Sequence, residues 1–307
     1  MLRFTLKRLI DGIITLGALV TLTFFVMRLA PGGPFSRSRK VSAEVLAIIE
    51  QKYHLDESIA QQFARYIWGL LHLDFGPSIR FRDYDVGALL ASGLPYSLTI
   101  GFWAVVVASL VGIALGMAGA LRRNSATDYL AGTIAVIGIA VPIFVIGPLF
   151  QVIFALKLGW LPVGGWNDGL RSVILPVLVL SLPNIAYISR ITRTSMIEVL
   201  RENYVRTARA KGLGAARTLR SHALKGALLP VIAYLGPACA AIITGSVLIE
   251  TIFAVPGIGR HFVDAALNRD YPLVMGVTVV YGGLLILFNI GTDLLRGYLD
   301  PRVRHGG

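Results

Sequence analysis

The segment Arg206-Thr-Ala-Arg-Ala-Lys-Gly-Leu213 lies within a basic stretch, residues 190–225, that separates two long apolar runs. This stretch holds nine Lys or Arg residues and only two Asp or Glu residues. So many charged side chains cannot lie in the apolar core of a bilayer, because each would lose its hydration there. The stretch therefore predicts a loop in water on one side of a membrane, where a soluble protein could bind.

The composition excludes an ordinary soluble protein. Hydrophobic residues make up 55% of the 307 residues, charged residues only 15%, and the mean hydropathy is +0.70. The apolar runs lack the two-residue alternation of a membrane β-barrel. Each is close to or beyond the roughly 20 residues that a helix needs to cross a bilayer. The sequence predicts an all-α polytopic membrane protein with six transmembrane helices, at residues 9–30, 98–121, 129–156, 172–189, 226–249 and 271–292.

The basic residues predict the orientation. The first run follows Arg3, Lys7 and Arg8, but its length and the proline at position 31 favour a retained span over a cleaved signal peptide. With a cytoplasmic N-terminus, six crossings place 17 of the 29 basic residues on the cytoplasmic side, but only six of the 17 acidic residues. This agrees with the positive-inside rule and explains the net charge of +12 without a nucleic-acid partner. Both termini are then expected in the cytoplasm.

The apolar runs divide the chain into four parts. Residues 1–30 comprise the cytoplasmic N-terminus and the first span, and residues 31–95 are long enough for a small helical subdomain on the outer side. Residues 96–300 form the core with the other five spans and the 190–225 loop, and residues 301–307 form a cytoplasmic tail.

Within the outer region, helical spacing of apolar residues predicts helices over residues 41–53 and 58–71. Residues 86–94 could lie along the membrane interface before the second span, and a short amphipathic stretch covers residues 261–267. Residues 261–267 could form either a helix on the membrane surface or a re-entrant helix.

The spans themselves carry few groups with chemistry. Gly112 and Gly116 place small residues on one helix face, which permits close helix packing. Asp11, Glu250 and Asp293 lie near span ends, so a proton relay would lack ionisable groups at mid-depth. The energy source for transport is therefore expected in another protein. The single cysteine, Cys239, excludes an intrachain disulfide.

The 190–225 loop has the pattern of a helical hairpin. Ser195 and Glu198 fit a capping box that would start a helix, and apolar residues recur at helical spacing as far as Ala208. Gly212 and Gly214 can adopt the left-handed backbone that ends a helix. A second helical stretch then leads to the fifth span. This order favours a docking element, although a charged loop that only fixes topology would have the same charge.

The same loop resembles the cytoplasmic loop of permeases in bacterial binding-protein-dependent ABC importers. Their general pattern is Glu-Ala-Ala, three residues, Gly, and later Leu-Pro. Arg206, Thr207 and Ala208 occupy the first three positions here, and Gly212 and Pro230 hold the glycine and the proline. Arg in place of Glu and the longer spacing to the proline are departures that the peptide-importer branch shares.

The resemblance extends over essentially the whole chain and narrows to the B-subunit family of oligopeptide permeases. The number and order of the matching segments make it specific, although permeases for related solutes share the scaffold. These segments are residues 27–32, 52–55, 74–78, 190–193, 195–200, 243–246, 250–252, 256–259 and 266–271.

The resemblance implies a type I ABC importer permease (MetI-like) fold, multi-pass in the inner membrane of a bacterium and surrounded by its lipid. It implies four kinds of partner: a second homologous permease, two ATP-binding subunits, an extracytoplasmic peptide-binding protein and the peptide substrate. We expect no metal, no catalytic residue and no cofactor in this chain. Because it lacks a Gly-x-x-x-x-Gly-Lys-[Ser/Thr] phosphate loop, ATP and Mg would bind to the partner subunits.

The resemblance also implies a coupling role for part of the loop. Closure of the ATP-binding subunits would pull on this segment and rock the spans between inward-open and outward-open states, so that import proceeds by alternating access. The substrate-binding residues stay unassigned. The residues expected to couple to the ATPases are Arg206, Thr207, Ala208, Arg209, Ala210, Lys211, Gly212 and Leu213.

Other functions fit part of these observations. The permease could carry dipeptides or another small solute, such as a nickel chelate or a glutathione-like molecule. A membrane receptor or scaffold would use the loop to dock a signalling protein. An intramembrane enzyme would need a nucleophile–base pair or metal ligands in its spans, but none of the five histidines lies in a span and there is no His-Glu-x-x-His motif. We therefore expect a transport permease and not an enzyme.

Overall fold

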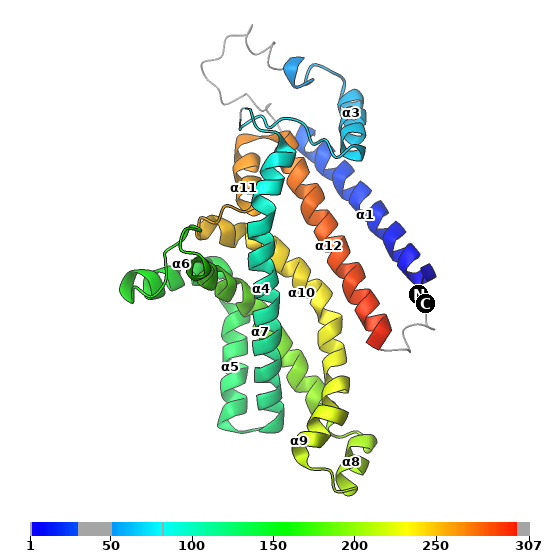
Figure 1. The fold of residues 1–307 in the computed structure, drawn as a ribbon, viewed down its shortest axis with the longest axis vertical. Helices are drawn as coiled ribbons and strands as arrows, with labels where there is room; N and C mark the ends of the chain where they lie inside the picture. The colour runs from blue at the N-terminus through cyan, green and yellow to red at the C-terminus, as the bar shows by residue number, and fades with distance from the viewer. Residues whose placement is uncertain (1, 30–50, 82, 300–307) are drawn as a thin grey trace.

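The structure is a computed structural model that describes residues 2–29, 51–81 and 83–299. It is helical, and its long helices run roughly along the long axis of the molecule (Figure 1). The π-helical turns η1 (Gln151–Lys157) and η2 (Leu219–Ala223) follow α6 and precede α10. The α-helices are α1 (Leu2–Leu29), α3 (Ile59–Leu71), α4 (Val86–Leu121), α5 (Ala126–Ala140), α6 (Ile143–Phe150), α7 (Leu170–Val199), α8 (Asn203–Ala210), α9 (Ala215–Thr218), α10 (Leu224–Ile252), α11 (Ile258–Asn268) and α12 (Tyr271–Leu299).

Five helices among the described residues are long and apolar enough to cross a membrane: α1, α4, α7, the continuous α9–α10 segment and α12. The remaining predicted span, residues 129–156, is not one helix. It consists of α5 followed by α6 and η1, bent by 105°. The bend falls where Pro142 lacks a backbone N–H and where Val141 has an extended conformation, with φ −91° and ψ 120°. The described residues contain six candidate spans, as predicted, if this bent pair counts as one.

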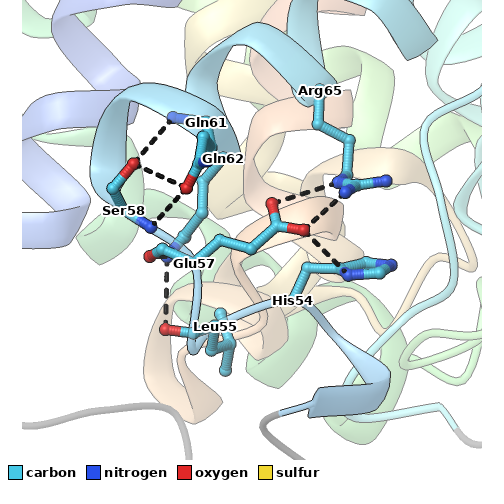
Figure 2. Close-up of polar contacts among 7 residues, drawn as sticks. All are labelled: His54, Leu55, Glu57, Ser58, Gln61, Gln62 and Arg65. Atoms are coloured by element: carbon cyan, nitrogen blue, oxygen red, sulfur yellow. Dashed lines mark hydrogen bonds and ion pairs between the residues drawn. The ribbon is translucent and has the colours of Figure 1, made fainter.

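The outer region contains the predicted helix over residues 58–71. Ser58 Oγ accepts a hydrogen bond from the Gln61 N–H at 3.4 Å, and Gln61 Oε1 accepts one from the Ser58 N–H at 3.1 Å, which forms a capping box (Figure 2). Glu57 pairs with Arg65 at 2.5 Å and with His54 at 3.2 Å. The hydrogen bond from Arg65 holds the pKa of the Glu57 carboxyl below its usual value. Of the predicted 41–53 helix, residues 41–50 lie outside the described residues.

Residues 86–94 differ from the interfacial segment that the sequence suggested. They form the first turns of α4, which continues through Pro95. The Asp85 carboxylate begins the helix by accepting a hydrogen bond from the Gly87 N–H at 2.9 Å. Val86 and Leu90 are buried against α11 and α12, so tertiary packing extends α4 beyond the membrane-spanning length. The stretch predicted at residues 261–267 is also helical and forms part of α11.

Helices α4 and α7 form the most extensive helix–helix contact among the described residues, and small residues allow their close approach. A Cβ added to Gly116 would lie 2.5 Å from the Ser189 carbonyl oxygen, and one added to Gly112 would lie 2.8 Å from Ile188 Cβ. The predicted close packing through these two glycines is confirmed. These two helices thus form the central pair of the bundle.

Helices α1 and α12 lie side by side (Figure 1). A Cβ on Gly12 of α1 would lie only 2.5 Å from Ile286 Cγ2 of α12. Arg8 and Asp293 connect the same two helices through a salt bridge of 3.1 Å. Thus α1 joins the bundle mainly through α12.

Candidate functional site

The predicted coupling segment lies at one end of the molecule, and α3 lies at the other (Figure 1). After α7 ends at Val199, residues 200–202 interrupt the helix, and α8 then follows. The chain turns over residues 211–214 and returns through α9 and η2 into α10. The result is the projecting helical hairpin that the sequence predicted, joined directly to two spans.

The predicted start of this hairpin is wrong. Ser195 and Glu198 lie inside α7, and no helix begins there. Ser195 is only 7% exposed, and its neighbour Met196 is fully buried in a cluster with Ala223 of η2. Packing against this cluster continues α7 past the local capping signal. The next helix starts at Asn203 instead.

A Schellman motif ends α8. The Gly212 N–H donates to the Arg209 carbonyl at 2.9 Å, and the Leu213 N–H donates to the Ala208 carbonyl at 3.3 Å. Gly212 has φ +83°, which confirms the predicted left-handed backbone at this position. Gly214 does not share it, because its φ of −60° and ψ of 152° are ordinary extended values. Only one of the two glycines is therefore required by the turn.

Two residues of α8 are buried where this helix packs against α9 and η2, the second half of the hairpin. Val205 is fully buried and Ala208 is 5% exposed, and α8 contacts both α9 and η2. Thr218, also buried, donates its hydroxyl to the Leu213 carbonyl at 3.3 Å. A displacement of α8 would therefore be transmitted to η2 and α10.

The other face of α8 is exposed and basic. Of the eight predicted coupling residues, Ala208 is buried, Leu213 is partly buried and the other six are exposed. The four salt bridges found among the described residues do not involve Arg206, Arg209 or Lys211. This surface offers cationic donors to a partner with acidic groups.

A carboxylate–guanidinium pair fixes the packing at the root of the hairpin. Arg193 of α7 donates its Nε to Asp128 Oδ1 at 2.5 Å and its Nη2 to Oδ2 at 2.7 Å. Asp128 lies in the first turn of α5, and its Oδ2 also accepts a hydrogen bond from the Asn124 N–H at 2.9 Å. The Asp128 side chain is 8% exposed and that of Arg193 36%. Sequence reasoning missed this pair, because an acid in the first turn of one helix does not identify its partner on another.

Buried acids organise the opposite end. Glu250 lies in the last turn of α10, near a span end as expected, and is fully buried. Its Oε2 accepts from the Gly259 N–H at 2.7 Å and from the Arg260 N–H at 3.3 Å, which places a carboxyl group at the N-terminus of α11. Asp270 accepts from the Ser78 hydroxyl and from the Arg80 N–H. Within the described ranges, no group of three or more His, Cys, Asp or Glu side chains is arranged to hold a metal ion.

Sequence comparison identifies the family. The family described as "Binding-protein-dependent transport system inner membrane component" matches residues 108–305. The chain belongs to this family. A second family, which describes the N-terminal part of such membrane components, matches residues 1–78 of this chain.

Similar proteins cover the entire inner membrane component. The oligopeptide transport system permease protein OppB of Salmonella typhimurium (strain LT2) is 50% identical over 306 residues, which are 99% of this chain and 100% of that protein. OppB of Escherichia coli (strain K12) is 51% identical over the same shares of the two chains. The dipeptide transport system permease protein DppB of Bacillus subtilis (strain 168) is 41% identical over 304 residues, or 99% of this chain and 98% of that one. The component is thus an OppB-like ABC permease and not an enzyme.

Solved structures share its fold. The inward-facing MetNI methionine ABC transporter gives a TM-score of 0.56 at 17% identity, covering 69% of this chain and 97% of that one. An amino acid ABC transporter with histidines gives 0.55 at 18% identity, covering 68% and 93%. The predicted all-α, MetI-like permease fold is confirmed.

Proposed function

We propose that this permease is the transmembrane subunit of an ATP-driven importer that moves oligopeptides across the cytoplasmic membrane by alternating access. The main support is the 50% identity to OppB of Salmonella typhimurium across the full length of both chains. The proposed complex also contains a second homologous permease, two ATP-binding subunits and an extracytoplasmic peptide-binding protein. ATP and Mg bind to the ATP-binding subunits, and this chain holds no cofactor.

In this proposal, residues 206–213 dock with an ATP-binding subunit. The exposed cations of α8 favour an acidic groove on that subunit, and the buried contacts of Val205 and Ala208 carry its motion to η2 and α10. The break at residues 200–202 lets α8 turn relative to α7. The root of α7 is held to α5 by Asp128 and Arg193, so that the spans respond together.

Peptide uptake by the reconstituted complex tests the function. The complex is placed in proteoliposomes with its binding protein, and uptake of radiolabelled oligopeptides and dipeptides is compared with and without ATP. We expect ATP-dependent oligopeptide uptake that requires the ATP-binding subunits. Uptake of dipeptides alone would favour the second candidate, a dipeptide permease, which the 41% identity to DppB of Bacillus subtilis supports. Uptake of a nickel chelate or glutathione in place of peptides would contradict both.

The proposed orientation places both termini and α8 in the cytoplasm and α3 outside. In a Cys239→Ala chain, we expect a membrane-impermeant maleimide to label Ala60→Cys in intact spheroplasts. It should label Ser221→Cys only after the membrane is permeabilised. Both native residues are exposed, so a difference reports the side of the membrane and not burial. The reverse labelling pattern would contradict this orientation.

A further inference from the structure

Helix α3 runs along α1 in the opposite direction. Near the end of α1, the Arg28 Nε donates to Gln62 Oε1 at 2.8 Å. One turn further down α1, the ring of Phe24 lies 5.1 Å from that of Phe63 and 6.2 Å from that of Tyr66. As α3 proceeds, these side-chain contacts move from Arg28 to Phe24, away from the end of α1. Figure 1 shows α3 beside this end of α1.

The second half of α3 extends past the level of Phe24. The ring of Tyr66 lies 6.2 Å from that of Phe24, and Ile67 and Leu70 pack against the apolar cluster of Val20, Phe24 and Met275. At about 1.5 Å per residue, Phe24 lies roughly 7 Å below Leu29, the last residue of α1. The span Thr5–Leu29 has 25 residues, or roughly 37 Å, which exceeds a hydrocarbon core of about 30 Å by only a few ångströms at each end. The C-terminal turn of α3 therefore lies within the depth range of the acyl chains.

Three large apolar side chains dominate the surface of this turn, which also exposes His72 beside Trp68. Trp68, Leu71 and Leu73 are 67%, 73% and 79% exposed. Leu73 has φ +58°, a left-handed conformation unusual for leucine, and the turn is held by hydrogen bonds from the Leu73 N–H to the Leu70 carbonyl at 3.1 Å and from the Asp74 N–H to the Gly69 carbonyl at 2.9 Å. The backbone thus holds three large apolar side chains at the tip of the outer subdomain.

We propose that this tip, residues 68–73, inserts among the acyl chains of the leaflet surrounding the α3 end of α1. Lipid is the expected neighbour of the tip, because the tip continues the apolar surface of α1. Val26 and Leu29 of α1 are 57% and 78% exposed near the same depth, and α1 is long and apolar enough to cross the membrane. Trp68 suits this position, since tryptophan favours the boundary between headgroups and acyl chains. The Arg65 side chain starts from the middle of α3 and pairs with Glu57 just before the first turn, so its charge is directed away from the tip (Figure 2).

The inserted tip would also fix the level of neighbouring segments. The chain leaving the tip reaches Ser78 and Arg80, which hydrogen-bond to the buried Asp270 just before α12. The tip, the outer subdomain and the start of α12 would therefore keep a constant height relative to the lipid. This role does not depend on the solute that is transported.

A depth series along one face of α3 tests the insertion. Ala60, Ala64, Trp68 and Leu71 are all exposed and recur at helical spacing, over roughly 16 Å of helix. A nitroxide is attached at each position singly, in a Cys239→Ala chain within its complex in nanodiscs of phosphatidylethanolamine and phosphatidylglycerol. Its collision rates with oxygen, which concentrates in lipid, and with a water-soluble nickel chelate are measured. We expect the oxygen-to-nickel ratio to rise at least fivefold from Ala60 to Leu71, where it should approach the ratio at Val26.

Each other outcome overturns the proposal. High nickel collision at all four positions would place α3 in water. Equal ratios at the four positions would mean that α3 lies parallel to the membrane plane. Low collision with both reagents at Trp68 and Leu71 would mean that protein covers the tip, either the second permease or another segment of this chain.

A pair of double variants provides a second measurement. Trp68→Lys/Leu71→Lys should lower the oxygen-to-nickel ratio of a label at Leu73 at least threefold, because two charges draw the tip out of the lipid. Ala60→Lys/Ala64→Lys adds the same charge to the same face near the aqueous end, and should leave that ratio unchanged. An equal effect of both double variants, or of neither, would contradict insertion of the tip.

Discussion

Gly212→Val reduces peptide uptake at least tenfold while the chain stays in the membrane at its normal level. Gly212 has φ +83°, a region that costs an L-residue about 1–2 kcal/mol and a β-branched residue more. An added Cβ would meet no atom within 4 Å, so the effect comes from the backbone and not from a clash. An isolated eight-residue helix is not stable alone, so loss of its Schellman motif would disorder the end of α8, which we propose docks with the ATP-binding subunit.

Gly214→Val is the matched control. Gly214 is equally exposed, and a Cβ there would also meet nothing within 4 Å, but its φ of −60° suits any residue. We expect this variant to retain at least half of the uptake, and Gly212→Asn to fall between the two, because asparagine tolerates the left-handed region. Uptake into proteoliposomes, normalised to the amount of chain, is measured together with co-purification of the ATPase. Equal losses at Gly212 and Gly214 would contradict the role of the left-handed turn.

Asp128→Ala lowers the thermal midpoint of the purified complex and reduces uptake. The variant removes a bidentate, charge-assisted pair and leaves the guanidinium of Arg193 without a partner between α5 and α7. Because the Arg193 side chain is 36% exposed, we expect a loss of about 1–3 kcal/mol, less than for a fully buried pair.

A double-mutant cycle separates the pair from its surroundings. Asp128→Ala and Arg193→Ala should each destabilise the complex, and the double variant should be less destabilised than the sum of the two, by about 1 kcal/mol. Arg190→Ala removes an exposed arginine from the same helix and should leave the midpoint nearly unchanged. Strictly additive losses at Asp128 and Arg193 would show that their contact contributes nothing to the packing of α5 on α7.

The sequence predicted the long helices well because hydropathy reports which segments enter the membrane. It could not show the bend at Val141 and Pro142, because apolar residues continue on both sides and membrane helices often contain proline without breaking. The capping motif at Ser195 wrongly predicted a helix start for a related reason. A local motif competes with tertiary burial, and the buried Met196 beside it keeps the helix intact.

At the candidate site, the sequence predicted correctly the feature that depends on the backbone conformation of a single residue. Gly212 was identified correctly because the left-handed turn is a local property of the backbone. The contact between Asp128 and Arg193 joins residues 65 positions apart, so only the fold brings them together. The burial of Val205 and Ala208 likewise depends on the return of α9 and η2, which hydropathy does not describe.

The pairing of α1 with α12 has a consequence for biosynthesis. Helix α1 leaves the ribosome well before α12, yet the two pack together, through Gly12 against Ile286 and through Arg8 with Asp293. At translation rates of about 5–20 residues per second, α1 would wait in the bilayer for on the order of ten seconds or longer before α12 is synthesised. During that interval α1 lacks the contacts that α12 supplies, and its 25-residue apolar span must hold it in the bilayer without them. The packing of α1 on α12 therefore forms late, once α12 has been synthesised.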